Sequence, residues 1–208
     1  MTYAVIKLGS PMKSDEVVDW IENTPKGRIL RAAAHLFKKQ GYEKTTVRDI
    51  AKAVGIHSGS IFHHFKSKDE ILEAIMEAVI LFNTHRLQQS IDTAKNLKDK
   101  MLALIKSELL FTSDETGEAM SLLITEWRSL SKLGQKRILR LRDIYEIIWL
   151  HIFNDAAKEK LISQEPFILR RFVTGIILWT PLWFKPEGKL SYDALAKSIL
   201  TLLLKDKV

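Results

Sequence analysis

The chain has no cysteine and no long uninterrupted apolar run, and each absence excludes a class of protein. Without cysteine it can form neither a disulfide nor a thiolate metal site. The longest apolar stretch, Phe172 to Phe184, is broken by Thr174, Thr180 and Pro181 and is too short to span a bilayer. The first residues, Met1 to Pro11, lack the charged start and the apolar segment of a signal peptide. We therefore expect a cytoplasmic protein without a membrane partner.

Features that support catalysis are also scarce. The nine glycines are scattered and form no phosphate-binding loop, and the sequence has no HExxH zinc motif. Two matches to the bare S-x-x-K spacing of some acylating enzymes occur, at Ser10–Lys13 and Ser129–Lys132, and so short a spacing arises by chance. The sequence predicts a protein that is not an enzyme and that holds no metal and no cofactor.

Positive charge, by contrast, is concentrated in one region. From Lys26 to Lys68 the chain has ten basic residues and two acidic ones, a net charge of +8, although the whole chain carries only +7. The rest of the chain is therefore close to neutral. A short, strongly basic segment is the electrostatic footprint of a module that binds a polyanion such as DNA. Charge alone leaves open a solvated basic face without a partner.

The residues in this basic segment predict three short helices. Thr24, followed by proline, is a helix start, because its hydroxyl caps free amides and proline suits the first helical position. Gly41 ends this helix, and Thr46 with Asp49 three residues later opens a second. A third helix runs to about Lys66-Ser67. Two short helices joined by a glycine-containing turn, with another packed behind them, form a helix-turn-helix, whose second helix enters the major groove of DNA.

The segment from Arg28 to Leu72 resembles the DNA-binding domain of the TetR family of repressors. The shared landmarks follow one another without a gap: Leu36-Phe37, Gly41-Tyr42, Thr45-Thr46-Val47, Ile50-Ala51, Val54-Gly55-Ile56, Gly59-Ser60 and Phe65-Lys66-Ser67-Lys68. The resemblance implies that the segment contacts operator DNA through phosphates, base edges and close backbone approach. The side chains and backbone positions that it assigns to DNA are Lys44, Thr45, Thr46, Ser58, Gly59, Ser60, Phe62, His63, His64, Lys66 and Lys68. Departures from the usual pattern at His57, Ser58, Phe62 and His64 leave the base preference unpredicted.

The rest of the chain has helical periodicity throughout and no alternating strand pattern. The expected helices are Asp69–Ser90, Leu97–Thr112, Thr116–Leu133, Gln135–Lys160, Glu165–Phe184 and Ser191–Leu204. The predicted fold is all-α, with an amino-terminal three-helix helix-turn-helix domain and a carboxyl-terminal helical bundle for ligand binding and dimerisation. The predicted divisions are an extension at 1–23, with a possible extra helix at Ser14–Asn23, a DNA-binding domain at 24–69 and a second domain at 70–208.

The last two helices have broad apolar faces, wider than one intramolecular contact needs. In TetR-like proteins these helices form a four-helix dimer interface, and the resemblance therefore predicts a homodimer. The interface residues that we predict are Gly175, Ile176, Tyr192, Leu195, Ile199 and Leu203. The alternative is that these faces belong to the core of a single chain.

The second domain is also rich in aromatic residues, which line apolar pockets or simply fill a core. We predict a ligand pocket formed by Trp127, Tyr145, Trp149, Phe172, Trp179 and Trp183. A weaker resemblance points to the fatty-acid-degradation regulators of the family, which respond to acyl-CoA thioesters. It is carried by Glu126-Trp127-Arg128, Arg142-Asp143 with Tyr145-Glu146, and Trp183-Phe184-Lys185-Pro186 with Gly188, followed by Leu190-Ser191.

These observations predict a ligand-responsive transcriptional repressor that binds double-stranded operator DNA as a dimer. A small hydrophobic effector, for which an acyl-CoA is one candidate, would release it. Two alternatives stay open on the sequence: a repressor of an efflux or detoxification system that responds to an apolar drug-like ligand, and a sequence-independent DNA-binding protein.

Overall fold

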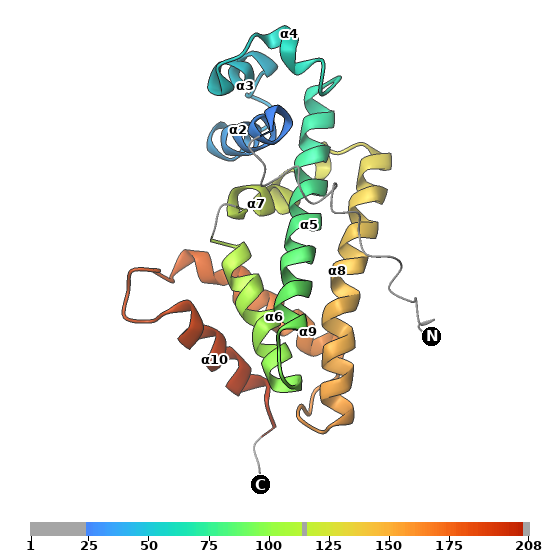
Figure 1. The fold of residues 1–208 in the computed structure, drawn as a ribbon, viewed down its shortest axis with the longest axis vertical. Coiled ribbons are helices and arrows are strands. Elements are labelled where there is room, and N and C mark those ends of the chain that lie inside the picture. Colours follow the sequence, from blue (N-terminus) through green and yellow to red (C-terminus); the bar gives the residue numbers. More distant parts are fainter. Residues whose placement is uncertain (1–23, 114–115, 206–208) are drawn as a thin grey trace.

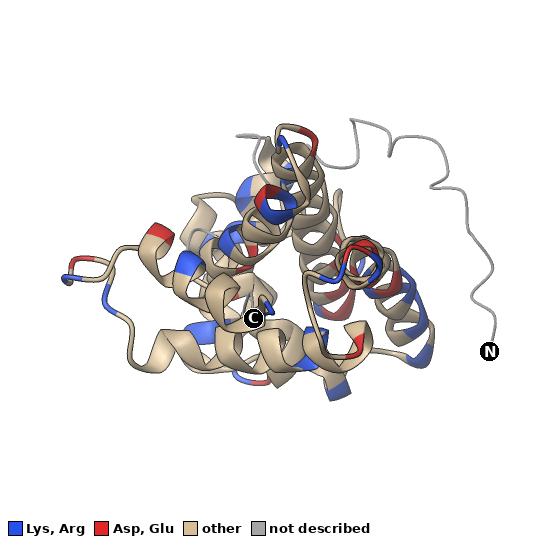
Figure 2. Cartoon of the chain, turned by 90° about the horizontal axis from the view of Figure 1, so that it is seen from below, with Lys and Arg blue, Asp and Glu red and all other residues tan. Residues whose placement is uncertain are grey.

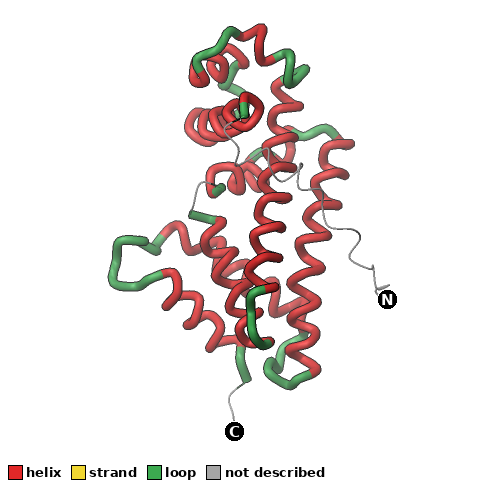
Figure 3. Tube along the Cα trace, in the orientation of Figure 1, coloured by secondary structure: helices red, strands yellow, loops and turns green. Residues whose placement is uncertain are grey.

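The computed structural model describes residues 24–113 and 116–205, so the possible helix at Ser14–Asn23 lies outside the described residues. Within those ranges the chain is helical without a strand, which confirms the predicted all-α fold (Figure 3). The α-helices are α2 (Pro25–Gln40), α3 (Val47–Val54), α4 (Ser58–Ile61), α5 (Lys68–Asp92), α6 (Leu97–Phe111), α7 (Gly117–Thr125), α8 (Lys132–Lys158), α9 (Pro166–Trp179) and α10 (Tyr192–Leu203). Two 3₁₀ turns, η1 (Trp127–Ser129) and η2 (Thr180–Leu182), follow α7 and α9.

The helices are arranged along one long axis (Figure 1). The helix-turn-helix, formed by α2, α3 and α4, occupies one end, and α5 runs from it through the length of the molecule beside α8. Helices α6, α9 and α10 lie at the other end, and α7 lies between the two ends, packed on both α2 and α5. Among the described residues, no helix combines the length and the apolar character needed to cross a bilayer.

The helix-turn-helix is built by the capping residues that the sequence indicates. The Thr24 hydroxyl accepts a hydrogen bond of 3.0 Å from the Gly27 amide at the start of α2. Thr46 and Asp49 form a reciprocal capping box at the start of α3. Gly41 and Gly55 end these two helices with φ angles of +91° and +76°, which side chains larger than hydrogen rarely allow. These caps and glycines therefore set where α2 and α3 begin and end, and they leave a tight turn between α3 and α4.

Three helices end earlier than predicted. The third helix of the helix-turn-helix stops at Ile61 rather than near Lys66-Ser67, and turns lead to Ser67, which caps α5. Helix α7 stops at Thr125, because Ser131 caps the start of α8 and the chain must turn first. Helix α9 stops at Trp179, since the ring of Pro181 forces a 3₁₀ turn there.

The hydrophobic core is continuous across the predicted division at 69/70. Buried residues of α2, α3 and α4 pack with the first half of α5, including Ile71, Leu72 and Ile75, and with Ala119 and Leu122 of α7. A second cluster joins the far half of α5 to α6, α8, α9 and α10. The DNA-binding end is therefore completed by residues that belong, in sequence, to the second domain.

Replacing Gly55 by alanine should destabilise the protein by about 1–2 kcal/mol, because a residue with a Cβ pays this cost in the left-handed region. A Cβ at position 55 would meet no atom within 4 Å, so the effect is one of backbone conformation alone. Urea unfolding measures it. The matched control is Gly59→Ala, which also has open space but a helical backbone and should be neutral or slightly stabilising. Equal stability of the two variants would contradict the argument.

Candidate DNA-binding surface and ligand cavity

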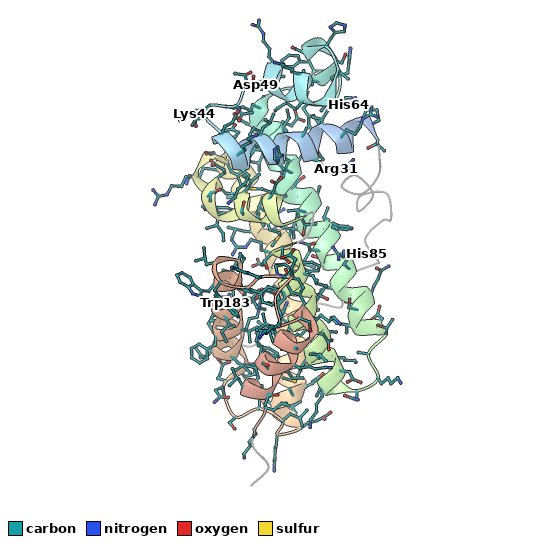
Figure 4. All side chains as sticks on the ribbon, turned by 90° about the vertical axis from the view of Figure 1, so that its left-hand side faces the viewer. Arg31, Lys44, Asp49, His64, His85 and Trp183 are labelled. Carbon is teal, nitrogen blue, oxygen red and sulfur yellow. The ribbon has the colours of Figure 1, made fainter. Side chains whose placement is uncertain are left out.

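Most of the residues that the sequence assigns to DNA lie on the surface of the helix-turn-helix end. Figure 4 shows Lys44 and His64 at this end of the molecule. The exposed positions of the predicted set are Lys44, Thr46, Gly59, Phe62, His63, His64 and Lys66, while Ser58, Ser60 and Lys68 are half-buried. The Phe62 ring is 54% exposed, which is unusual for a large apolar side chain and leaves it free to contact another molecule. The arrangement offers cations, small residues and one aromatic ring on the exposed surface of this end.

Thr45 is the exception, and for its side chain the prediction needs correction. It is only 1% exposed. Its hydroxyl donates a hydrogen bond of 2.8 Å to the Gly41 carbonyl and accepts one of 3.2 Å from the Gln40 amide. The side chain therefore holds the turn between α2 and α3 together and cannot reach DNA.

Thr46 and Lys68 also have partners within the chain. The Thr46 hydroxyl and the Thr46 backbone amide both donate hydrogen bonds to the Asp49 carboxylate, and these bonds lower the pKa of that carboxyl. The Lys68 ammonium donates to the Tyr42 carbonyl at 2.9 Å and lies 4.2 Å from the centre of the Tyr42 ring. It also donates to the Glu43 carbonyl at 3.4 Å. Lys68 thus positions the loop that carries Lys44, and one of its three N–H donors remains for a phosphate.

A cavity of about 310 Å³ lies in the other half of the molecule, between α5, α6, α7, α8 and α9. Its walls are largely apolar, with Ile80 from α5, Met120 and Leu123 from α7, and Leu178 from α9. The volume falls within the range of small-molecule sites. Side chains from five helices meet here, so an occupant would contact every element that links the two ends of the molecule.

One side of the cavity is formed by a buried charged network. Arg170, 4% exposed, pairs with Glu108 at 3.0 Å and with Glu146 at 3.1 Å. The Tyr145 hydroxyl donates a hydrogen bond of 3.1 Å to Glu108, and Arg171 pairs with Glu146. The guanidinium of Arg170 also lies 4.0 Å from the centre of the Trp149 ring. Such a network holds α6, α8 and α9 in a fixed relation, because each member is satisfied by another.

The network fixes the charges of its members. Burial, and then the negative charge of Glu108, raise the pKa of Tyr145 well above its ordinary value, so its hydroxyl keeps its proton. For Arg170, burial alone would lower the pKa, but Glu108, Tyr145 and Glu146 together raise it. Arg142 also lines the cavity, is exposed, and forms no ion pair with a described residue. The charged side chains of the lining thus carry a net charge of +1, and Arg142 is the cation that has no ion-pair partner among the described residues.

The aromatic residues predicted to form the pocket are mostly elsewhere. Tyr145 alone among the six lines the cavity. Trp127 packs against the core of the DNA-binding end, and Trp149 is fully buried under Arg170. The rings of Phe172, Trp179 and Trp183 are 57%, 65% and 48% exposed on the outer surface, where Figure 4 shows Trp183. These three correct the prediction: their size suggested a lining, but on α9 and directly after η2 they are exposed on the surface and do not line the cavity.

The set of residues predicted to form the pocket contains none of the charged residues that line the cavity. A sequence signal for them exists, since Arg170-Arg171 interrupts the apolar run of α9. A charged side chain within such a run is either buried with an ionic partner or reaches the surface. Arg170 is buried with its partner, and Arg171 reaches the surface. The partners themselves, Glu108 and Glu146, lie far away in sequence on helices that carry many other charges.

The predicted dimer residues divide into two groups. Leu195, Ile199 and Leu203 are buried in the core of the chain, where α10 packs on α6, and Tyr192 is half-buried against the same core. Gly175 and Ile176 line a shallow surface groove with Phe172 and Leu202. Much of the ribbon at this end carries no charged residue when seen along the long axis (Figure 2). The large apolar side chains that face outward here are Phe167, Ile168, Phe172, Trp179, Leu182, Trp183 and Leu202.

Comparison with known proteins gives consistent results. The family model for bacterial regulatory proteins of the tetR family matches residues 29–75, and the model for tetracyclin repressor-like C-terminal domains matches residues 94–206. The HTH-type transcriptional repressor KstR2 of Mycolicibacterium smegmatis is 29% identical over 180 residues, covering 85% of this chain and 87% of the relative.

Solved structures share the fold. The crystal structure of superantigen pfit has a TM-score of 0.82 and 48% identity, over 88% of this chain and 91% of that one. The crystal structure of AibR in complex with isovaleryl coenzyme A and operator DNA has a TM-score of 0.74 and 24% identity, over 84% of this chain and 95% of that one. At this identity, the likeness to AibR is one of fold.

Proposed function

Because this chain belongs to the tetR family of bacterial regulatory proteins, we propose that it is a repressor that binds operator DNA as a dimer and releases it when an acyl-CoA thioester occupies the cavity. The exposed cations and Phe62 of the helix-turn-helix form the DNA-binding surface. The cavity between α5 and α9 holds the acyl group. The proposal assigns the two ends of the molecule to DNA and to effector.

The observation that carries this proposal is that α7 belongs to both ends. Ala119 and Leu122 are fully buried in the same core as α2 and α3. Met120 and Leu123, on the same nine-residue helix, line the cavity. A ligand that moves α7 therefore disturbs the packing behind the helix-turn-helix directly.

A polar contact strengthens this connection. The Nδ1 atom of His35 on α2 lies 3.0 Å from a carboxylate oxygen of Glu118 on α7. Glu118 directly follows Gly117, which lines the cavity, so adjacent residues form the cavity wall and the contact with the DNA-binding end. Helix α5 supplies a second route, since Ile80 lines the cavity and the same helix begins directly after the helix-turn-helix. Differential packing in the free and bound states is what couples two sites.

The choice of effector rests on the lining. An apolar cavity of this volume suits an acyl group but not a whole coenzyme A. The excess positive charge, with Arg142 on the exposed side, suits the phosphates of the remaining part. AibR, which has the same fold, forms a complex with isovaleryl coenzyme A and operator DNA. A neutral drug-like ligand would leave Arg142 without a role.

The experiment is footprinting on the chain's own promoter, followed by titration with short- and medium-chain acyl-CoA thioesters and with neutral apolar compounds. We expect protection of a specific site, with at least about 10³-fold preference over bulk DNA. We expect release by a thioester and not by a neutral compound. Binding without sequence preference would indicate the sequence-independent alternative, and release by neutral compounds alone would refute the acyl-CoA assignment.

Dimerisation is the second part of the proposal, and it gives a separate prediction. Gly175 lies on the outer face of α9, and a Cβ there would meet no atom of its own chain within 4 Å. Gly175→Arg should therefore fold normally but place a charge in the proposed apolar contact, shifting the protein from dimer to monomer in light-scattering measurements. Leu133→Arg, on an exposed residue of α8, is the matched control and should stay dimeric. A dimeric Gly175→Arg would place the interface elsewhere.

A further inference from the structure

One polar side chain in the cavity wall stands outside the charged network. Asn83, on α5, is 1% exposed and lines the cavity. Neither its amide oxygen nor its amide nitrogen has a hydrogen-bond partner among the residues that the structure describes. Buried amides without partners are rare, because the bonds to water lost on burial are then not replaced. An unpaired amide in the wall of a cavity is therefore best explained by a partner that the cavity receives.

The polar neighbours of Asn83 differ from it. On the same helix, the buried Thr84 donates its hydroxyl to the Ile80 carbonyl at 2.6 Å. Across the cavity, the Thr174 hydroxyl donates to the Arg170 carbonyl at 2.9 Å, and Tyr145 is bonded to Glu108. These hydroxyls are satisfied within the chain. Asn83 thus offers both a donor and an acceptor to an occupant of the cavity.

We propose that the effector's acyl group carries a hydroxyl or keto oxygen, and that Asn83 binds this oxygen. This inference rests on the proposed function, since it specifies the acyl-CoA. Arg142 and Arg171 are exposed, whereas Asn83 is almost fully buried, so the charged part of the thioester stays outside and the acyl part reaches Asn83. A hydroxyl satisfies both amide atoms, and a keto oxygen accepts from the nitrogen. A saturated chain leaves the amide unpaired, which is the basis on which such sites discriminate.

The position of Asn83 gives this contact a regulatory consequence. It lies on α5, the helix that continues from the helix-turn-helix, so a bond to Asn83 acts on the element that carries the DNA-binding end. A saturated thioester can fill the cavity without making this bond. The oxygenated thioester should therefore be both the tighter ligand and the more effective one in releasing operator DNA.

The test is calorimetric titration of the full-length chain with butanoyl-, hexanoyl- and octanoyl-CoA. Each is compared with three counterparts that carry one added oxygen: a hydroxyl at carbon 3, a keto group at carbon 3, or a hydroxyl at the chain end. We expect at least one oxygenated thioester to bind about tenfold or more tightly than its saturated parent. In Asn83→Leu this preference should fall below about twofold, while the saturated parent binds at least as well as it does to the wild type. Asn83→Ala should show the same loss.

Thr84→Val is the matched control, because it removes a buried hydroxyl that is already bonded within its own helix, and it should keep the preference. Folding of the variants is checked by thermal melting, where ligand-free Asn83→Leu should melt at or above the wild-type temperature since it removes an unpaired buried amide. A lower melting temperature would mean that Asn83 has a structural partner, and would overturn the proposal. Thioesters that bind without any preference, or with a preference that survives in Asn83→Leu, would also overturn it and leave the acyl-CoA assignment intact. If no thioester binds, the acyl-CoA assignment fails as well.

Discussion

Gly59→Glu should reduce operator affinity by about 100-fold or more, roughly 3 kcal/mol, while leaving the fold unchanged. Gly59 is exposed at the helix-turn-helix, and a Cβ there would meet no atom of the chain within 4 Å. The chain therefore has no structural need for glycine at this helical position. The resemblance to the family assigns it to close approach of the backbone to DNA. A carboxylate there would both occupy this space and repel phosphates.

The measurement is operator binding by fluorescence anisotropy at fixed salt, with thermal melting of the same sample. Lys95→Gln changes the net charge by the same single unit, far from the helix-turn-helix in the connection between α5 and α6, and is the control. It should change affinity by less than about threefold, because charges more than a Debye length away are largely screened. If Gly59→Glu binds as well as this control, α4 is not the element that enters the groove.

Arg170→Met should destabilise the protein by about 3–5 kcal/mol, the cost typical of breaking a buried ion pair from one side. Glu108 is 8% exposed, and Arg170 provides its cationic partner at 3.0 Å. Without Arg170 the carboxylate stays buried with one neutral hydrogen bond, from Tyr145. Methionine keeps an unbranched side chain without the guanidinium, so the loss comprises the ion pairs and the cation–π contact with the Trp149 ring. For a chain of this length it corresponds to a fall of roughly 6–20 °C in melting temperature.

Arg171→Met, one residue away, is the matched comparison and should cost less than about 1 kcal/mol. The Arg171 side chain is 47% exposed, and its partner Glu146 keeps a bond to Arg170. The double variant Arg170→Met, Glu108→Gln should recover much of the stability, since no uncompensated charge remains. Urea unfolding of the three variants checks this, and equal losses for Arg170→Met and Arg171→Met would contradict the assigned network.

The first two helices of the helix-turn-helix, α2 and α3, could be predicted nearly residue by residue because their signals are local. The capping box at Thr46 and the glycines at positions 41 and 55 act on backbone atoms a few positions away. The ends of α4 and α7 were less predictable, because they depend on the residues that cap the next helices, Ser67 and Ser131.

The cavity depends on long-range contacts, and the lining predicted for it was mostly wrong. A large aromatic residue is compatible with the core, a cavity wall or the outer surface. Trp149 lies in the core, Tyr145 lines the cavity and Trp179 is exposed on the surface. What distinguishes the cavity is the pairing of charges on three helices and one unpaired amide. Neither has a signature at fixed spacing, because Arg170 and Glu108 are 62 positions apart. Asn83 directly follows the apolar stretch Ala78–Phe82 of α5, whose sequence does not mark which of its residues face a cavity.

The shared core around α5 and α7 has a consequence for protein engineering. Hybrid regulators are made by joining the DNA-binding part of one protein to the sensing part of another, and the natural junction in sequence is residue 69 or 70. In this chain such a junction would transplant α2, α3 and α4 without Ile71, Leu72 and Ile75, against which they pack. A hybrid that retains the native residues through Phe82, together with the inward face of α7, would keep the packing of the donor protein. We expect such a hybrid to respond to a new effector more often than one joined at residue 69 or 70.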